Sequence, residues 1–204
     1  MPTKAGPSTG EANYRRVLRA AVRGLWGGVI DYYGFYEVMF VAIDNAFYRA
    51  WYEGAAECGI KPEELTPDEQ QELQQAIATE RGFIGRFADT IEKNSKAEGG
   101  KLTPLLNRVD RWVIRYNDIR NRAKMMACGD QKLEWVLGIS EHCDSCLKLA
   151  GKIKRASYWQ ENDVRPQHPT KLLCMIGAGG VSVCQCALVP TDRHLSPGPL
   201  PSLP

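Results

Sequence analysis

The chain has no run of about 18 uncharged apolar residues, the length that a membrane-spanning helix requires. Its most apolar segment, residues 29–51, is interrupted by four charged residues: Asp31, Glu37, Asp44 and Arg49. The first ten residues, MPTKAGPSTG, lack the apolar core of a secretory signal. We therefore expect no membrane span and no export, and cysteines held as thiols or thiolates in a reducing compartment.

Signatures of catalysis are also scarce. Only three histidines occur in 204 residues, and none accompanies a nucleophile pattern such as G-x-S-x-G. The glycine-rich segment 177–180 lacks the Lys-Ser/Thr pair of a phosphate-binding loop. The C-x-x-C motif at Cys143 follows Glu141-His142, whereas zinc deaminases have a proline there. We predict that the protein is not an enzyme.

A strong net charge is missing as well, because the chain carries only +2, which argues against a basic nucleic-acid binder as a description of the whole chain. The charge is unevenly distributed, however. Residues 53–98 hold 5 Lys/Arg against 11 Asp/Glu (a balance of −6), and residues 101–155 hold 12 against 6 (+6). These two segments either face each other or face different partners.

Four helices are predicted in a helical domain over residues 11–130, after a flexible arm (1–10) rich in Pro, Gly, Ser and Thr. We expect them at 11–26, 29–57, 66–93 and 103–129. Thr66, Pro67 and Glu69 form a capping box at the start of the third. The second is apolar around most of its circumference, so it is buried in the bundle or packs against other subunits.

Four arginines of the fourth predicted helix share one narrow arc at about 100° per residue: Arg108, Arg111, Arg115 and Arg122. One interpretation is a solvated face with local ion pairs, such as Arg111 or Arg115 with Asp118. The other is a contact stripe for phosphate or for an acidic neighbouring subunit.

The pattern changes after residue 130. Residues 135–139 and 181–189 are predicted strands of a cysteine-rich module over 131–192, and the Pro-rich tail 193–204 is expected to be extended. The predicted fold class is mainly α, a helical bundle with long helices, followed by a small α+β module of the zinc-ribbon kind.

Five of the seven cysteines lie in this module: Cys143, Cys146, Cys174, Cys184 and Cys186. A C-x-x-C turn can direct two thiolates to one tetrahedral ion, and residues i and i+2 of a strand point to the same face. A segment this poor in large aliphatic residues also needs extra stabilisation. We predict a structural Zn²⁺ bound by four of the five cysteines, with Cys174 as the supernumerary candidate.

Two alternatives remain for these cysteines, namely disulfides and unpaired core residues. Cys58 and Cys128 are interpreted as core residues at helix ends, and His142 and His168 are left out of the ligand set. A thioredoxin-like redox pair requires a βαβ pattern, which does not precede the motif.

The segment from Trp135 to Pro190 resembles the C-terminal signature of minor head (head-morphogenesis, Mu F-like) proteins of tailed bacteriophages. The shared features are Trp135, Gly138, His142, Cys143, Cys146, the Leu149–Lys152 segment, Trp159, Arg165-Pro166, His168-Pro169, Leu173-Cys174, Gly179-Gly180 and the closing Cys184-Gln185-Cys186. Gln185 stands where these proteins usually have an arginine. Over residues 11–130 the resemblance is only architectural.

The resemblance implies a non-catalytic virion protein of the head interior or portal vertex, present in the host cytoplasm during assembly. Its partners would be portal or capsid proteins, packaged DNA and further copies of itself. The alternative is a zinc-ribbon nucleic-acid-binding protein, because Lys148, Lys152, Lys154 and Arg155 follow the C-x-x-C motif and Tyr158 and Trp159 could stack on bases.

Overall fold

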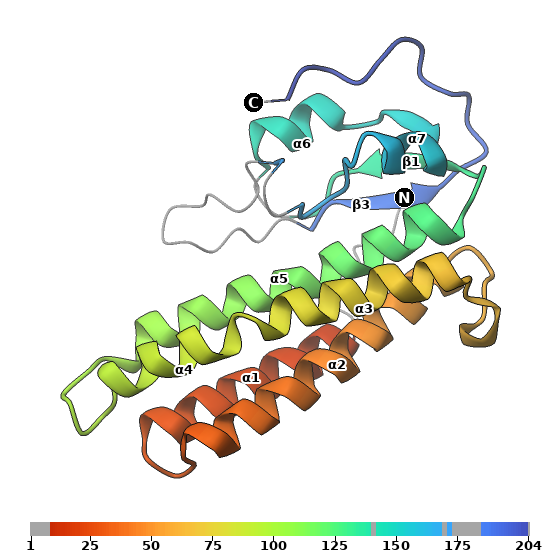
Figure 1. Cartoon of the computed structure of the whole chain (residues 1–204). Helices are drawn as coiled ribbons and strands as arrows, with labels where there is room; N and C mark the ends of the chain where they lie inside the picture. The colour runs from red at the N-terminus through yellow and green to blue at the C-terminus, as the bar shows by residue number, and fades with distance from the viewer. Residues whose placement is uncertain (1–8, 140–141, 169–170, 173–184, 204) are drawn as a thin grey trace.

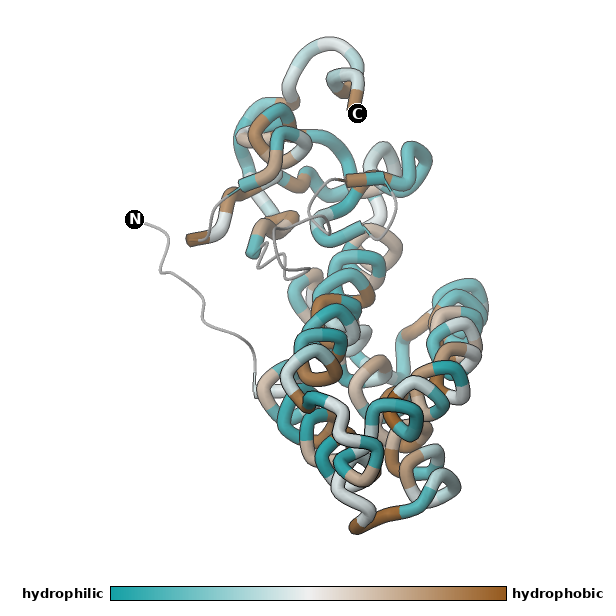
Figure 2. The backbone as a smooth tube through the Cα atoms, turned by 90° about the vertical axis from the view of Figure 1, so that its left-hand side faces the viewer, coloured by the Kyte–Doolittle hydropathy of each residue, from teal (hydrophilic) through white to brown (hydrophobic). Residues whose placement is uncertain are grey.

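The computed structural model describes residues 9–139, 142–168, 171–172 and 185–203. It shows an elongated bundle of helices with a small α+β module at one end (Figures 1 and 2). The predicted fold class, mainly α followed by a small α+β unit, is confirmed.

The bundle consists of α1 (Thr9–Trp26), α2 (Tyr32–Ala56), α3 (Pro67–Arg81), α4 (Ile84–Lys93) and α5 (Leu102–Ala127), with a short 3₁₀ turn at Pro62–Glu64. Helices α3 and α4 follow one another along α2, so together they take the place of one helix in a four-helix bundle with α1, α2 and α5. No described helix is long and apolar enough to cross a membrane.

Local sequence explains the helix starts. Asp31 caps α2 by accepting a hydrogen bond from the backbone N–H of Gly34 (2.8 Å). Thr66 and Glu69 form the predicted capping box of α3. The single helix predicted over 66–93 was wrong, because the chain leaves helical hydrogen bonding at Gly82 and Phe83 and begins α4 at Ile84.

The bundle core is aromatic. Phe87 packs edge-on against both Phe35 of α2 and Trp112 of α5, with ring centroids 6.0 and 5.2 Å apart. Helix α2 approaches α5 closely at Gly54, where a Cβ atom would lie 2.2 Å from the carbonyl oxygen of Arg120. A glycine is therefore required where these two helices touch.

The module consists of β1 (Lys132–Val136), α6 (Asp144–Leu149), β2 (Ile153–Arg155), α7 (Ala156–Glu161) and β3 (Ala187–Pro190). The strands lie in the order β2-β1-β3, and both pairings are antiparallel. Alternate residues of β1 are buried, and Trp135 packs against Trp159 of α7 at 5.7 Å between ring centroids. The first strand begins three residues earlier than predicted, and neither short helix was predicted. Of the second predicted strand, 181–189, residues 187–189 belong to β3 and residues 181–184 lie outside the described residues.

The C-terminal tail, described over residues 193–203, has no helix or strand in that range and runs along the module (Figure 1). Ser196 and Ile153 exchange two hydrogen bonds, and the ammonium group of Lys154 donates to the carbonyl oxygen of Ser196 (2.8 Å). Leu200 and Leu203 pack against the module core. The extended conformation was predicted, whereas the contacts with the module were not.

Candidate metal centre and its attachment to the bundle

The C-x-x-C motif marks the beginning of α6. Cys143 is the residue that precedes the first helical turn, and its carbonyl oxygen accepts a hydrogen bond from the N–H of Leu147 (3.0 Å). Cys146 is fully buried and Cys143 is half-buried. The described strands pair only in antiparallel fashion, so this helix start is not part of the βαβ unit that a thioredoxin-like site needs.

The second cysteine motif ends beside the first. Cys186, directly before β3, is buried in the module core, and its sulfur lies 3.7 Å from Nδ1 of His142. Because His142 is the neighbour of Cys143, this contact brings the two motifs together from segments that are 43 residues apart in sequence (186 − 143).

Two glycines of the module make this approach feasible. A Cβ atom on Gly138 would lie 2.5 Å from the carbonyl oxygen of Gln185, so no larger residue fits beside the C-x-C segment. Gly151 has a positive φ of 71° in the turn between α6 and β2. That turn is tied to β1, because Gly151 donates to the carbonyl of Trp135 and Trp135 donates to the carbonyl of Lys152 (both 2.9 Å).

The donor types at this place suit a zinc ion, since thiolate and imidazole are its preferred ligands. Among the residues that the structure describes, no three His, Cys, Asp or Glu side chains form a group that could hold a metal. Cys174 and Cys184, two of the five predicted candidates, lie outside the described residues. The structure thus brings Cys143, Cys146 and Cys186 into one core and leaves their coordination a prediction.

A buried ion pair attaches the module to the bundle. The guanidinium of Arg165 donates to the carboxylate of Asp118 on α5 (2.6 Å), and the two side chains are 3% and 0% exposed. Asp118 also pairs with Arg115 (2.8 Å), which in turn binds Glu80 of α3 (3.2 Å). Burial raises the pKa of Glu80, although Arg115 opposes the shift.

Two further polar residues of α5 reach the module. Asn121 donates to the side-chain oxygen of Gln167 (2.9 Å), whose amide nitrogen donates to the backbone carbonyl of Cys186 (2.9 Å). Lys124 donates to the carbonyl of Leu188 in β3 (2.6 Å). Asp118, Asn121 and Lys124 are spaced three residues apart and therefore lie along one side of α5. Sequence reasoning missed this polar row, and its regular spacing was the available signal.

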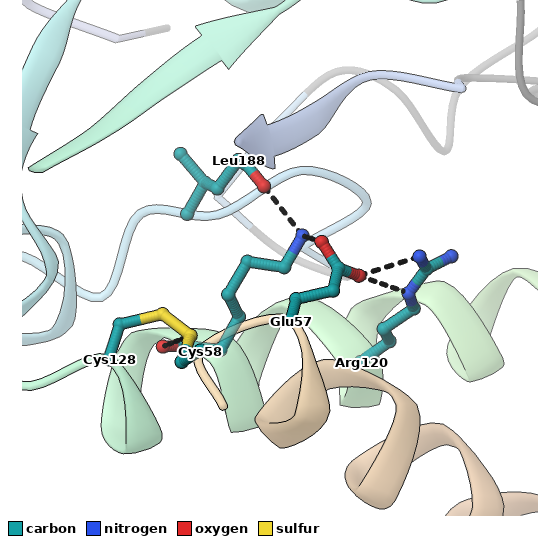
Figure 3. Close-up of a disulfide and its surroundings, with 6 residues drawn as sticks. Glu57, Cys58, Arg120, Cys128 and Leu188 are labelled. Carbon is teal, nitrogen blue, oxygen red and sulfur yellow. Dashed lines mark hydrogen bonds and ion pairs between the residues drawn. A yellow bond between two sulfur atoms is a disulfide. The ribbon is translucent and has the colours of Figure 1, made fainter. Parts of the chain in front are cut away.

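A disulfide lies at the same end of the bundle (Figure 3). Cys58, after the end of α2, is bonded to Cys128, after the end of α5. Both belong to the module core at helix ends, as interpreted. The expectation that cysteines are held as thiols or thiolates was wrong for this pair. Next to the bond, Glu57 pairs with Arg120 (2.6 Å) and with Lys124 (2.5 Å).

The predicted arginine stripe is largely used inside the bundle. Besides the pairing of Arg115, Arg122 binds Glu72 of α3 (2.5 Å), and Arg108 lies over the ring of Phe87 and donates to Thr90 (3.3 Å). Arg111 is exposed. The acidic segment 53–98 and the basic segment 101–155 thus face each other, which was one of the two possibilities for these segments.

The basic cluster after α6 is also partly occupied. Lys154 is buried beneath the tail, Arg155 pairs with Asp130 (2.8 Å), and Lys152 is half-buried. Trp159 is fully buried and donates its indole N–H to the carbonyl of Leu133 (3.2 Å), so the expectation that it could stack on bases was wrong.

No protein-family model, curated protein sequence or solved structure matches this chain.

Proposed function

We propose that this protein is a non-catalytic structural component of a tailed-phage head, associated with the portal or the inner capsid. In this role it assists head assembly or DNA passage, and its C-terminal module is stabilised by one zinc ion. The bundle supplies the contact surfaces, and the module is a rigid attachment at its end.

One observation carries the proposal. Several of the described residues by which the chain resembles minor head proteins build the module. Trp135 and Trp159 form its core, and Gly138 and Gly151 allow the close approach and the turn that bring the cysteine motifs together. A resemblance confined to surface residues would have had no such physical basis.

The described donors are held from several directions. The first turn of α6 fixes Cys143 and Cys146, and Gln167 holds the backbone of Cys186 from the side of α5. A bound Zn²⁺ would supply a closed thiolate site and roughly 10 kcal/mol or more of apparent folding free energy. The described part of the module has a small core with three short strands and two short helices, so it needs such a contribution.

The metal proposal is tested by elemental analysis of the full chain, purified without chelators and with the thiols protected. We expect one zinc per chain, and less than one in Cys143→Ser and Cys146→Ser variants. The matched control is the double variant Cys58→Ser/Cys128→Ser, which removes two sulfurs that belong to neither motif and should retain zinc. A metal-free wild-type chain with a folded module would refute the proposal.

The head assignment needs a separate test. We expect mass spectrometry of purified particles, from a tailed phage that encodes this chain, to find it in the head fraction in low copy number. Its absence from both particles and assembly intermediates would contradict the assignment.

Binding to DNA distinguishes the alternative function. If affinity for duplex DNA falls steeply with salt and is lost in a Lys148→Ala/Lys152→Ala variant, a zinc-ribbon nucleic-acid-binding protein explains the chain better. The burial of Trp159 and Lys154 counts against that outcome, because neither can contact bases or phosphates in this fold.

A further inference from the structure

Helix α2 has a largely apolar, partly exposed stripe on the side opposite its buried residue Ile43, and only its members Tyr48 and Tyr52 are partly packed against the core. Its members recur at spacings of three and four residues, which places them on one side of the helix: Gly34, Val38, Val41, Asn45, Tyr48 and Tyr52. Val41 is 57% exposed and Val38 is 39% exposed. We call this stripe, with Glu37 and Arg49 at its edges, the α2 surface.

The α2 surface is hollowed along its length. A groove of about 620 Å³ between α1 and α2 is lined by Tyr14, Val17, Val38 and Val41 among others. A second hollow of about 680 Å³ continues past Tyr48 and Tyr52. Both are lined by Asn45 and Arg49, so they form one continuous depression along α2. Such a shape accepts the side chains of another helix.

The charges at the edges of this surface are complementary to each other. Glu37 and Arg49 each lie six residues from Ile43, on opposite sides of it (43 − 37 and 49 − 43). The described residues offer Glu37 no ion pair, and Arg49 pairs only within α2, with Glu53 at 3.1 Å. That pair is exposed and contributes little, so Arg49 can be shared with a second carboxylate.

We propose that the α2 surface binds a second copy of this chain, with the two α2 helices antiparallel across a two-fold axis near Ile43. In this arrangement Glu37 of each copy meets Arg49 of the other, so the ion pair forms twice. Val38 comes opposite Tyr48, since they lie five residues before and after Ile43 (43 − 38 and 48 − 43). Val41 comes opposite Asn45 in the same way.

A second copy fits this surface better than an unrelated partner because the stripe is complementary to itself. A two-fold interface brings the same patch of both subunits together, so each acidic edge requires a basic edge at the mirrored position along the helix. The interface is independent of the zinc proposal, because it includes no residue of the module.

The dimer should be weak, because two faces of single helices bury little area by the standard of stable complexes. We expect sedimentation velocity of the full chain to show a monomer–dimer equilibrium with a dissociation constant on the order of micromolar. The Glu37→Arg and Arg49→Glu variants should each weaken it about tenfold or more, because each places like charges opposite one another twice.

Mixing the two variants is the decisive measurement. In a heterodimer of one Glu37→Arg chain and one Arg49→Glu chain, both opposing pairs again carry opposite charges, so dimerisation should return. Both positions are solvent-exposed, and circular dichroism is expected to show unchanged helicity. The matched control is Glu161→Arg, an equal charge change at an exposed position of the module, which should leave the dimer unaffected.

Three results would overturn the proposal. The first is a wild-type chain that stays monomeric up to about 200 µM, well above the expected dissociation constant. The second is a dimer that neither variant weakens, and the third is a mixture that does not recover. The antiparallel arrangement is supported if dimerisation is weakened in each single variant and returns when the two variants are mixed.

Discussion

Replacing Arg165 with methionine removes the cation that attaches the module to α5. The methionine retains most of the side-chain volume, so the change chiefly deletes the charge and its hydrogen bonds. Asp118, which is 0% exposed, would lose its 2.6 Å partner and, among the described residues, retain Arg115 at 2.8 Å. Breaking a buried pair from one side costs about 3–5 kcal/mol, because the remaining charge stays desolvated.

Because Asp118 keeps Arg115 as a partner, we expect the loss in free energy of unfolding at the lower end of this range, about 3 kcal/mol. A matched control is Arg193→Met, which deletes the same chemical group from an ion pair with Glu134. The side chain of Arg193 is 67% exposed, so its loss should cost less than about 1 kcal/mol. The two variants differ mainly in how deeply the replaced arginine side chain is buried.

The assay is urea unfolding of the full chain followed by tryptophan fluorescence. Trp135 and Trp159 report on the module, and Trp51 and Trp112 report on the bundle. For Arg165→Met we expect a lower midpoint, with the module losing its structure before the bundle, which lowers the apparent slope of the main transition. A loss of stability no larger than that of Arg193→Met would refute the importance of this pair.

Three further predictions concern the same molecule. Replacing Cys58 and Cys128 with serine should lower the free energy of unfolding by about 4 kcal/mol, because the bond closes a loop with a sequence separation of 70; a chain whose stability does not change on reduction would contradict this. Gly54→Ala should destabilise by about 2 kcal/mol or more in thermal unfolding because its Cβ would meet the α5 backbone, whereas Gly85→Ala in α4 should be near neutral. Burial lowers the pKa of His168 below its usual 6.5, so the unfolded chain binds its proton more readily and stability should fall as pH drops below 6.5; His168→Gln should flatten this dependence, and equal slopes would refute it.

The bundle was predictable because its signals are local. The 3.6-residue period and the capping box of Thr66 and Glu69 located the helices to within a few residues. The break at Gly82 was not predictable in the same way. Both Gly82 and Gly85 weaken a helix, but whether the chain bends there depends on how α3 and α4 pack on α2.

The interface between the bundle and the module depends on contacts that no local sequence pattern encodes. Arg165 meets Asp118 across 47 residues, and Cys58 meets Cys128 across 70. Helical spacing correctly grouped Arg115 and Arg122 on one arc. It could not reveal that Glu80 and Glu72 of α3 face them, because the partner of a surface arc is decided by tertiary packing.

The polar row on α5 determines how the module sits as well as how strongly it is held. Asp118, Asn121 and Lys124 each meet a different kind of partner in the module: a guanidinium, a side-chain amide and a backbone carbonyl. If the module slipped along α5 by one turn, each of these buried groups would face the wrong partner, at about 1–3 kcal/mol per unsatisfied group and more for the charged ones. An apolar seam would tolerate such a slip, so the polar row specifies one docked position. Gln167 extends that constraint to the backbone of Cys186, and the geometry of the candidate metal centre is therefore set in part by α5.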